Sequence, residues 1–306
     1  NDNTLGWFPW RSLKTSPLKD GNGNCLLYAV SSTYKSSPEA DMLNEDSNGM
    51  FQIVDEMGGL VQGVAAPDSV VAVIFSAGDV LAGQNRVYQD GTECGNQGDD
   101  TDADDFSDYL DALEVSPGDV VDNSALVTGN DDEIYRFVQA ATATNKGIIN
   151  DQFITISREE LWAAITARPD FIEKMSNLTE ALAVCLSNYA VANLKNRLPW
   201  PAPMDLSLPL LAPEYYRADH NYDDNADATP GYAGRFPYIV KDSNDDIVIA
   251  AAVDALFTEA TCDSLILPTG GITVDLLAVA PGASDEYINL WKNWKDHFFY
   301  VVSQDY

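Results

Sequence analysis

The chain is poor in basic residues and in long apolar runs, and each shortage argues against a class of function. Only 17 lysines and arginines stand against 48 aspartates and glutamates in 306 residues, which gives a formal net charge of −31. Such a surface repels polyanions, so we expect no nucleic-acid partner. No stretch reaches the roughly 18 consecutive apolar residues that cross a bilayer, so we expect no membrane span in this chain.

Catalytic patterns are also scarce. The two histidines, His220 and His297, form no metal-ligand pair. The chain has neither a nucleophile elbow nor a glycine loop of the kind that cradles phosphate. Spacing alone does not reveal a glycosidase-like pair among 48 acidic residues. We therefore predict that the protein is not an enzyme.

The most informative pattern is a sequence motif, referred to below as the repeated phrase, that occurs twice. A Gly-x-Phe-Pro-aromatic corner at 6–10 is followed by an aromatic and β-branched segment at 26–31, and the corner at 234–238 is followed by a similar segment at 298–303. Such a recurrence indicates internal duplication. We predict an α+β fold of two modules, residues 1–157 and 158–306. Each is expected to pack a helix on a small, mainly antiparallel sheet with long ordered loops.

Local signals predict several elements inside these modules. Short β-branched runs at 26–32, 70–76 and 151–157 are typical of strands. Ser157 is a good helix N-cap, and Glu160 three residues later completes a capping box. Apolar residues then recur at helical spacing, and Pro169 divides the segment, which predicts a second helix over 170–194.

The second module resembles a known family. Its helix ends in Tyr189-Ala190 and runs into Arg197-Leu198-Pro199, and the corner and a Tyr-x-Val-Ser strand follow. This order is similar to that of type IV pilin-like proteins and pseudopilins, which are made with a class III prepilin leader. Trp200 stands where that family usually has a cysteine, so its local disulfide is not implied. The resemblance implies a structural subunit of an extracellular pilus-like filament, active in assembly, adhesion or transport at the cell surface.

The first module has only a few residues before its corner, whereas the second has a helix. We expect that the first module has lost this helix or receives it from a separate short chain. In the second case an apolar groove would lie near Trp7, Phe8 and Tyr28, since such a patch normally marks an interface. The candidate core or interface anchors of both corners are Trp7, Phe8, Trp10, Tyr28, Phe236 and Tyr238.

One acidic loop is a candidate calcium site. Its side-chain oxygens fall at positions 1, 3, 5, 9 and 12 of a calcium loop, which are Asp100, Asp102, Asp104, Asp108 and Asp111. Asp105 replaces the usual glycine, and a solvated acidic loop is the alternative. A calcium site would also suit a second function, that of a secreted calcium-dependent binding or adhesion module.

Four cysteines, Cys25, Cys94, Cys185 and Cys262, show no Cys-x-x-Cys spacing. In an exported chain they are expected to pair, and three connectivities are possible. The duplication favours one bridge in each module, Cys25 with Cys94 and Cys185 with Cys262. Four buried free thiols are the alternative.

Overall fold

The structure is a computed structural model, and its chain divides into two compact units, Asn1–Ala163 and Ala164–Tyr306. We predicted a boundary after residue 157; the division falls six residues later, inside a helix. The described residues are 3–35, 43–86, 94, 106–126, 134–139, 149–192, 198, 233–236, 240–241, 247–248, 264–266, 273–275, 286–294 and 297–301.

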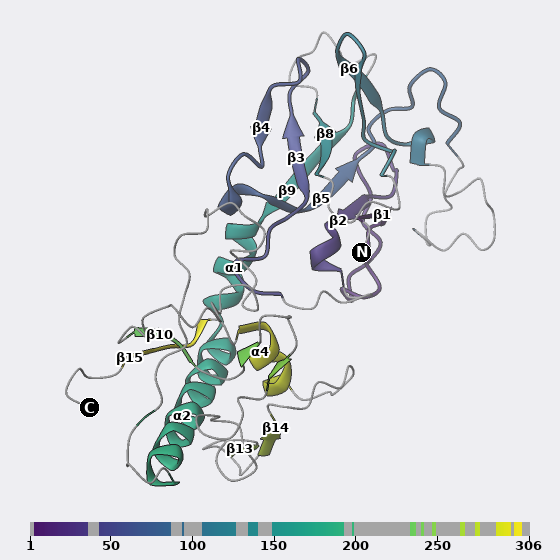
Figure 1. Ribbon diagram of the computed structural model, residues 1–306. Coiled ribbons are helices and arrows are strands. Elements are labelled where there is room, and N and C mark those ends of the chain that lie inside the picture. Colours follow the sequence, from purple (N-terminus) through teal and green to yellow (C-terminus); the bar gives the residue numbers. More distant parts are fainter. Residues whose placement is uncertain are drawn as a thin grey trace. The chain divides into compact units, whose positions relative to one another are not determined.

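A curled seven-stranded sheet dominates the first unit (Figure 1). Its strands are β1 (Thr4–Trp7), β2 (Leu27–Val30), β3 (Phe51–Val54), β4 (Leu60–Gln62), β5 (Val70–Ser76), β8 (Tyr135–Val138) and β9 (Gln152–Ser157). The strand order is β1-β2-β5-β3-β4, with β8 paired to β3 and β9 paired to β5. The β3–β8 pair is parallel and the other described pairs are antiparallel. The fold is mixed α+β, and this sheet is larger than the small one that we predicted.

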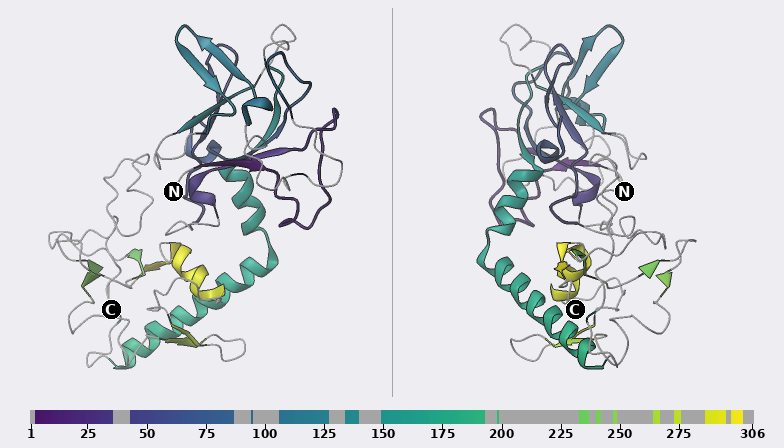
Figure 2. Two further views of the ribbon diagram at one scale, coloured as in Figure 1. Left: turned by 90° about the vertical axis from the view of Figure 1, so that its right-hand side faces the viewer. Right: turned by 60° about the vertical axis from the view of Figure 1, so that its left-hand side comes forward.

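Short elements complete the first unit. A hairpin of β6 (Ala112–Ser116) and β7 (Asp119–Asp122) projects at one end of the sheet (Figure 2). Three 3₁₀ helices are η1 (Ser32–Tyr34), η2 (Ala66–Asp68) and η3 (Phe106–Asp108). The hairpin contributes its alternate apolar residues to a small second core with Val54, Val138 and Ile149. This core closes the end of the sheet from which the hairpin rises.

The predicted strand over 70–76 is the central strand β5, with the same bounds. It pairs with β2 on one side and β9 on the other, and most of its apolar side chains are buried. Phe75 lies in the main core, where its ring packs edge-on against Phe137 and Phe153 at centroid distances of 5.1 and 5.2 Å. Phe51 packs on Phe137 in the same way at 5.1 Å. These four phenylalanine rings fill the inside of the curled sheet.

The first helix, α1 (Arg158–Thr166), begins where β9 ends, and its capping box is confirmed. The Glu160 backbone N–H donates to Ser157 Oγ at 3.2 Å, and Glu160 Oε2 accepts from the Ser157 backbone N–H at 2.9 Å. Trp162 of this helix is buried and donates its Nε1–H to the Tyr34 hydroxyl at 3.1 Å. Burial raises the pKa of Tyr34 to about 12.

The second unit contains the long helix α2 (Pro169–Ala192), which begins at the proline that we expected to divide the two helices. A buried stripe of Leu178, Ala181, Leu182 and Cys185 recurs at helical spacing. The helix α4 (Glu286–Trp294) lies beside α2, as Figure 2 shows, and Trp294 packs edge-on against Phe171 at 5.1 Å. The two tryptophans of α4, Trp291 and Trp294, are both buried.

Three short antiparallel pairs accompany these helices. They are β10 (Ala233–Arg235) with β15 (Phe299–Val301), β11 (Val240–Lys241) with β12 (Ile247–Val248), and β13 (Ser264–Ile266) with β14 (Thr273–Asp275). Helix α2 contacts β13, and α4 contacts β14. Among the described residues, no helix is long and apolar enough to cross a bilayer.

Candidate functional site

A buried polar network lies where β9 begins. Asp151 directly precedes this strand and is fully buried. Its Oδ2 accepts from the Asp111 backbone N–H at 2.8 Å and from Asn123 Nδ2 at 2.9 Å. Asn123 in turn exchanges two hydrogen bonds with the backbone of Val138, each 2.9 Å long. One carboxylate and one amide therefore tie together the ends of β7 and β8 and the beginnings of β6 and β9.

Asp111 supplies a second carboxyl group to this network. Its Oδ1 accepts from Gln84 Nε2 and its Oδ2 accepts from the Asn150 backbone N–H, both at 2.8 Å. The Asp111 and Asp151 carboxyl groups also influence each other's ionisation. Two neighbouring carboxylates repel one another, so the pair favours a state in which one carboxyl group carries a proton.

The electrostatics assign that proton to Asp151. Burial, followed by the neighbouring charge of Asp111, raises the pKa of Asp151 to about 8. Burial also raises the pKa of Asp111, against the opposing effect of its two backbone N–H donors. Asp151 Oδ1 is buried and has no hydrogen-bond partner among the described residues. A neutral, protonated carboxyl group avoids an uncompensated buried charge at this oxygen.

Arg86 neutralises part of this charge. Its guanidinium donates to backbone carbonyls rather than to the carboxylates, at 2.7 Å to Gly78, 2.9 Å to Ala77 and 3.0 Å to Asp108. Its guanidinium also lies 5.7 Å from the centre of the Tyr109 ring. Arg86 therefore fastens the loop after β5 to the segment that contains Asp111, and its charge lowers the pKa of both carboxyl groups.

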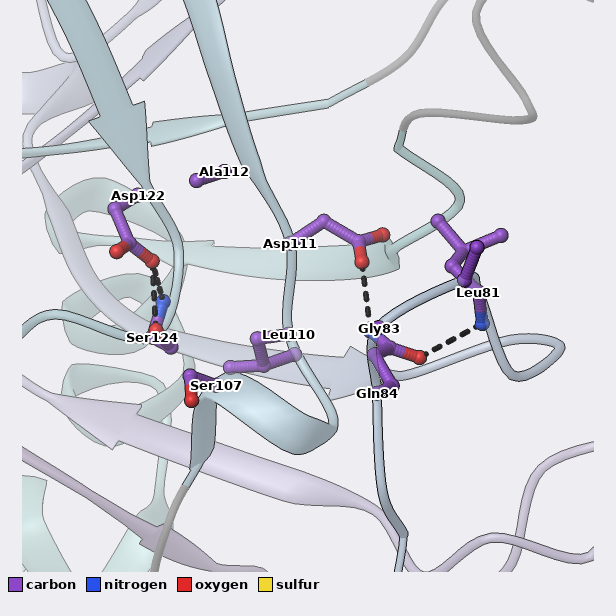
Figure 3. A pocket seen from close by; sticks show the side chains of 10 residues that line it. Leu81, Gly83, Gln84, Ser107, Leu110, Asp111, Ala112, Asp122 and Ser124 are labelled. Carbon is purple, nitrogen blue, oxygen red and sulfur yellow. Dashed lines mark hydrogen bonds between the residues drawn. The ribbon is translucent and has the colours of Figure 1, made fainter.

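An open hollow of about 380 Å³ lies beside Asp111 (Figure 3). Gln84 bridges its wall, because its Nε2 donates to Asp111 and its Oε1 accepts from the Leu81 backbone N–H at 2.9 Å. Asp122 and Ser124 line the same hollow and are hydrogen-bonded to each other. The polar groups that face it are thus largely engaged with protein partners.

The predicted calcium loop is described only at its end. Asp100, Asp102 and Asp104 lie outside the described residues. Asp108 accepts from the Asn85 backbone N–H at 2.7 Å, and Asp111 binds Gln84 and Asn150 as above. No group of three possible metal ligands occurs among the residues that the structure describes. Calcium at this loop stays a prediction, and in the described part both aspartates hold backbone segments.

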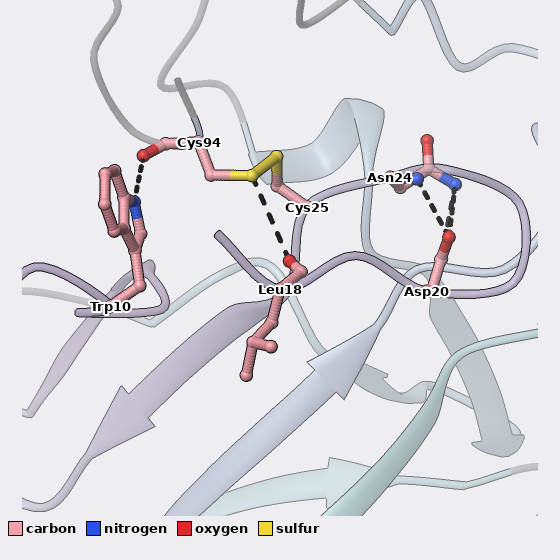
Figure 4. The surroundings of a disulfide bond; sticks show 6 residues. All are labelled: Trp10, Leu18, Asp20, Asn24, Cys25 and Cys94. Carbon is pink, nitrogen blue, oxygen red and sulfur yellow. Dashed lines mark hydrogen bonds between the residues drawn. A yellow bond between two sulfur atoms is a disulfide. The ribbon is translucent and has the colours of Figure 1, made fainter. Parts of the chain in front are cut away.

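The expected bridge between Cys25 and Cys94 is present. Both cysteines are buried, and Trp10 donates its Nε1–H to the Cys94 carbonyl at 2.8 Å (Figure 4). Asp20 caps the turn that precedes Cys25 by accepting from the Asn24 backbone N–H at 2.8 Å. Cys185 is also disulfide-bonded, and its expected partner Cys262 lies outside the described residues.

Both copies of the repeated phrase form the same antiparallel pair. In the first, Gly6 pairs with Tyr28 across β1 and β2, and the Phe8 backbone N–H donates to Leu26 at 3.0 Å. In the second, Gly234 pairs with Tyr300 across β10 and β15, and the Phe236 backbone N–H donates to Phe298 at 2.8 Å. The register matches residue for residue, so the repeat extends from sequence to local structure.

The two copies bury opposite faces of this pair. In the first unit, Leu27 and Ala29 are 0% exposed in the core. Their counterparts in β15, Phe299 and Val301, are 62% and 71% exposed. One face of the strand pair is thus a core face in the first unit and an open apolar face in the second.

The opposite face of the strand pair is buried in the second unit and only partly buried in the first. In the second unit, Phe236 and Phe298 are 3% and 8% exposed, and both rings pack on Trp291 of α4 at 6.2 and 5.7 Å. Their counterparts in the first unit, Phe8 and Leu26, are only partly buried. Phe8 there packs edge-on against Tyr28 at 6.3 Å.

The predicted anchors therefore differ in role. Phe236 is a core residue, Trp7 packs on the main core against Tyr109 at 5.1 Å, and Trp10 binds the disulfide loop. Phe8 and Tyr28 lie on the partly open face, and Tyr238 lies outside the described residues. Asn123, Arg86 and the proximity of Asp151 to Asp111 were not predicted, because their partners are distant in the chain.

Comparison with protein-family models, curated proteins and solved structures finds no match for this chain. Its function must therefore be argued from its own residues.

Proposed function

We propose that this protein is a structural subunit of an extracellular type IV pilus-like filament or pseudopilus, built from two related pilin-like modules. The observation that carries the proposal is the repeated strand pair. Both phrases on which the family resemblance depends fold into the same pair with the same register. Each pair also leaves one apolar face wholly or partly open.

Two further features support a structural role outside the cell. Disulfides persist in oxidising surroundings, and Cys25–Cys94 ties the first strand pair to a distant segment. The net charge of −31 keeps subunits soluble before assembly, while the apolar faces supply the attraction that assembly needs. In this account the buried network around Asp151 stabilises the first unit and has no catalytic task.

The proposal is tested on material sheared from the surface of producing cells. Sedimentation of that material followed by mass spectrometry should recover this polypeptide in the high-molecular-weight pellet. Recovery only in the soluble fraction contradicts the filament role. A soluble chain would favour the second candidate, a secreted calcium-dependent binding module.

One observation favours that second candidate: the predicted calcium loop ends at Asp108 and Asp111, beside the open hollow. Titration calorimetry with calcium chloride tests it directly. The double variant Asp102→Asn/Asp104→Asn should abolish binding, because these ligands belong to the core of the predicted loop. Asp119→Asn, on the β6–β7 hairpin, is the matched control and should bind as the wild type does. Absence of binding to the wild type contradicts this candidate.

A further inference from the structure

The loop that follows the first corner carries positive charge on a strongly acidic chain. No acidic residue occurs over positions 3–19, whereas Arg11, Lys14 and Lys19 lie there within nine positions. Arg11 and Lys14 are exposed, and Lys19 is half-buried. The whole chain has 48 acidic and 17 basic residues, so this stretch reverses the prevailing charge. We call residues 11–19 the basic loop.

Lys14 has a backbone conformation that disfavours a lysine. Among the described residues it is the one non-glycine residue with a left-handed φ, 54°. The Lys14 backbone N–H donates to the Arg11 carbonyl at 3.1 Å, and the Thr15 backbone N–H donates to the Trp10 carbonyl at 3.0 Å. These two bonds form a Schellman motif, in which the residue at the place of Lys14 is usually glycine or asparagine. Because backbone strain of this kind is concentrated at functional sites, the lysine points to a task for its ammonium group.

Contacts on both sides hold the basic loop in place. Trp10 donates its Nε1–H to the Cys94 carbonyl at 2.8 Å (Figure 4). At the other end, the Leu26 backbone N–H donates to the Leu18 carbonyl at 3.2 Å. The Arg11 guanidinium lies 5.0 Å from the centre of the Trp10 ring, a favourable cation–π contact. A surface that is ordered before binding loses less conformational entropy when a partner docks.

We propose that the basic loop docks on the acidic surface of a second copy of this chain. Charge complementarity argues for this occupant, because a chain with 48 acidic residues presents mainly carboxylates to its neighbour. Leu13 and Leu18, at 55% and 39% exposure, add apolar contact area within the same loop. A long polyanion fits less well, since it would extend beyond nine residues onto a surface of its own sign.

The contact has a consequence for assembly. A basic loop and an acidic surface are different patches, so their contact is heterologous and leaves one free patch of each kind on a dimer. A contact of this kind propagates into a ring or an open filament. The inference thus deepens the proposed filament role and rests on it, because it names one surface through which the copies meet.

Zero-length cross-linking of the 306-residue chain tests the contact. Unlabelled and ¹⁵N-labelled chains are mixed in equal amounts, and a carbodiimide joins lysine amines to carboxylates that touch them. Mass spectrometry then selects peptide pairs with one light and one heavy member. These pairs should join Lys14 or Lys19 to aspartates or glutamates. Pairs that omit both lysines, or an absence of mixed pairs, overturn the inference.

Sedimentation velocity of charge variants provides the matched control. It is run at about 0.15 M salt, where a Debye length of about 8 Å screens the repulsion between whole chains. Lys14→Glu/Lys19→Glu should weaken association by roughly tenfold or more, because like charges then face each other. Lys35→Glu/Lys174→Glu changes the net charge equally outside the loop and should associate like the wild type. Equal effects of the two double variants overturn the inference.

Lys14→Asn separates binding from folding. Asparagine adopts a left-handed φ more readily than lysine, so the urea midpoint of this variant should equal or exceed that of the wild type. Its association should nevertheless be weaker, because the ammonium group is lost. Association equal to that of the wild type would contradict the role of Lys14 and overturn the inference.

The remaining outcomes separate this contact from the filament role. A wild type that stays monomeric at all concentrations but binds dextran sulfate overturns the second copy in favour of an anionic polymer. If the expected cross-links form but the chain is absent from sheared surface fibres, the contact stands and the filament role fails. Fibres of this chain without cross-links from the basic loop leave the filament role and remove the contact.

Discussion

At the scale of single residues, the first unit depends on a buried acid. Asp151 accepts two hydrogen bonds through Oδ2, and its other oxygen is buried without a hydrogen-bond partner among the described residues. Burying two carboxyl groups together is unfavourable unless one is neutral. A neutral Asp151 avoids this repulsion, and the stability of the first unit therefore depends on pH.

The sign of that dependence follows from the pKa of Asp151. Its pKa rises from the ordinary value of 3.8 to about 8 in the folded chain. The protonated acid thus favours folding fully below pH 4, and this contribution is lost as the pH rises toward 8. Asp151→Asn keeps an acceptor for the Asp111 backbone N–H and for Asn123, and it removes the group that ionises.

We therefore expect Asp151→Asn to be more stable than the wild type at pH 8, by about 2 kcal/mol or more. The difference should shrink toward pH 4, and urea unfolding at a series of pH values measures it. Asp111→Asn is the contrasting variant. Both Asp111 oxygens accept hydrogen bonds, so the new amide N–H₂ of this variant would face a donor. Asp111→Asn should therefore destabilise the fold at every pH of the series. Parallel pH profiles for wild type and Asp151→Asn contradict this account.

The disulfide is a second residue-scale test. Cys25 and Cys94 are 69 residues apart in sequence, so their bond restricts a long loop of the unfolded chain. Loop entropy predicts that Cys25→Ala/Cys94→Ala loses about 4 kcal/mol of unfolding free energy in the first unit. Denaturant unfolding under oxidising conditions measures the loss. An unchanged midpoint would show that the bridge does not stabilise the folded state.

At the scale of elements, the sequence predicted those features that depend on interactions between residues close together in the chain. The strand at 70–76, the helix start at Ser157 and the break at Pro169 all depend on neighbours within four residues, and the structure has each of them. The parallel pairing of β8 with β3 was missed, because Tyr135 lies opposite Phe51 only in the folded chain. The Asp151 network was missed for the same reason: Asp111 and Asn123 reach it from other elements.

The capping box gives an element-scale prediction. Glu159 and Glu160 are adjacent acids in the first turn of α1, and Glu160 Oε2 accepts from both the backbone N–H and the hydroxyl of Ser157. Glu160→Ala should therefore cost about 1 kcal/mol more than Glu159→Ala, since both lose the same favourable charge at a helix N-terminus. Urea midpoints of the two variants measure the difference. Equal losses would mean that the charge, and not the cap, stabilises the helix start.

At the scale of the whole molecule, the repeated strand pair is what connects sequence to function. The sequence predicted that the two phrases are equivalent, and their common register agrees with this. It did not predict that each copy buries a different face, because β2 and β15 carry apolar or aromatic residues on both faces. Only packing against Trp291 in one unit and against Phe75 and Phe153 in the other decides which face is open.

The most direct test of the account is electron cryomicroscopy of fibres sheared from producing cells. The account predicts regular filaments whose density fits this chain. Filaments that lack this chain would contradict it.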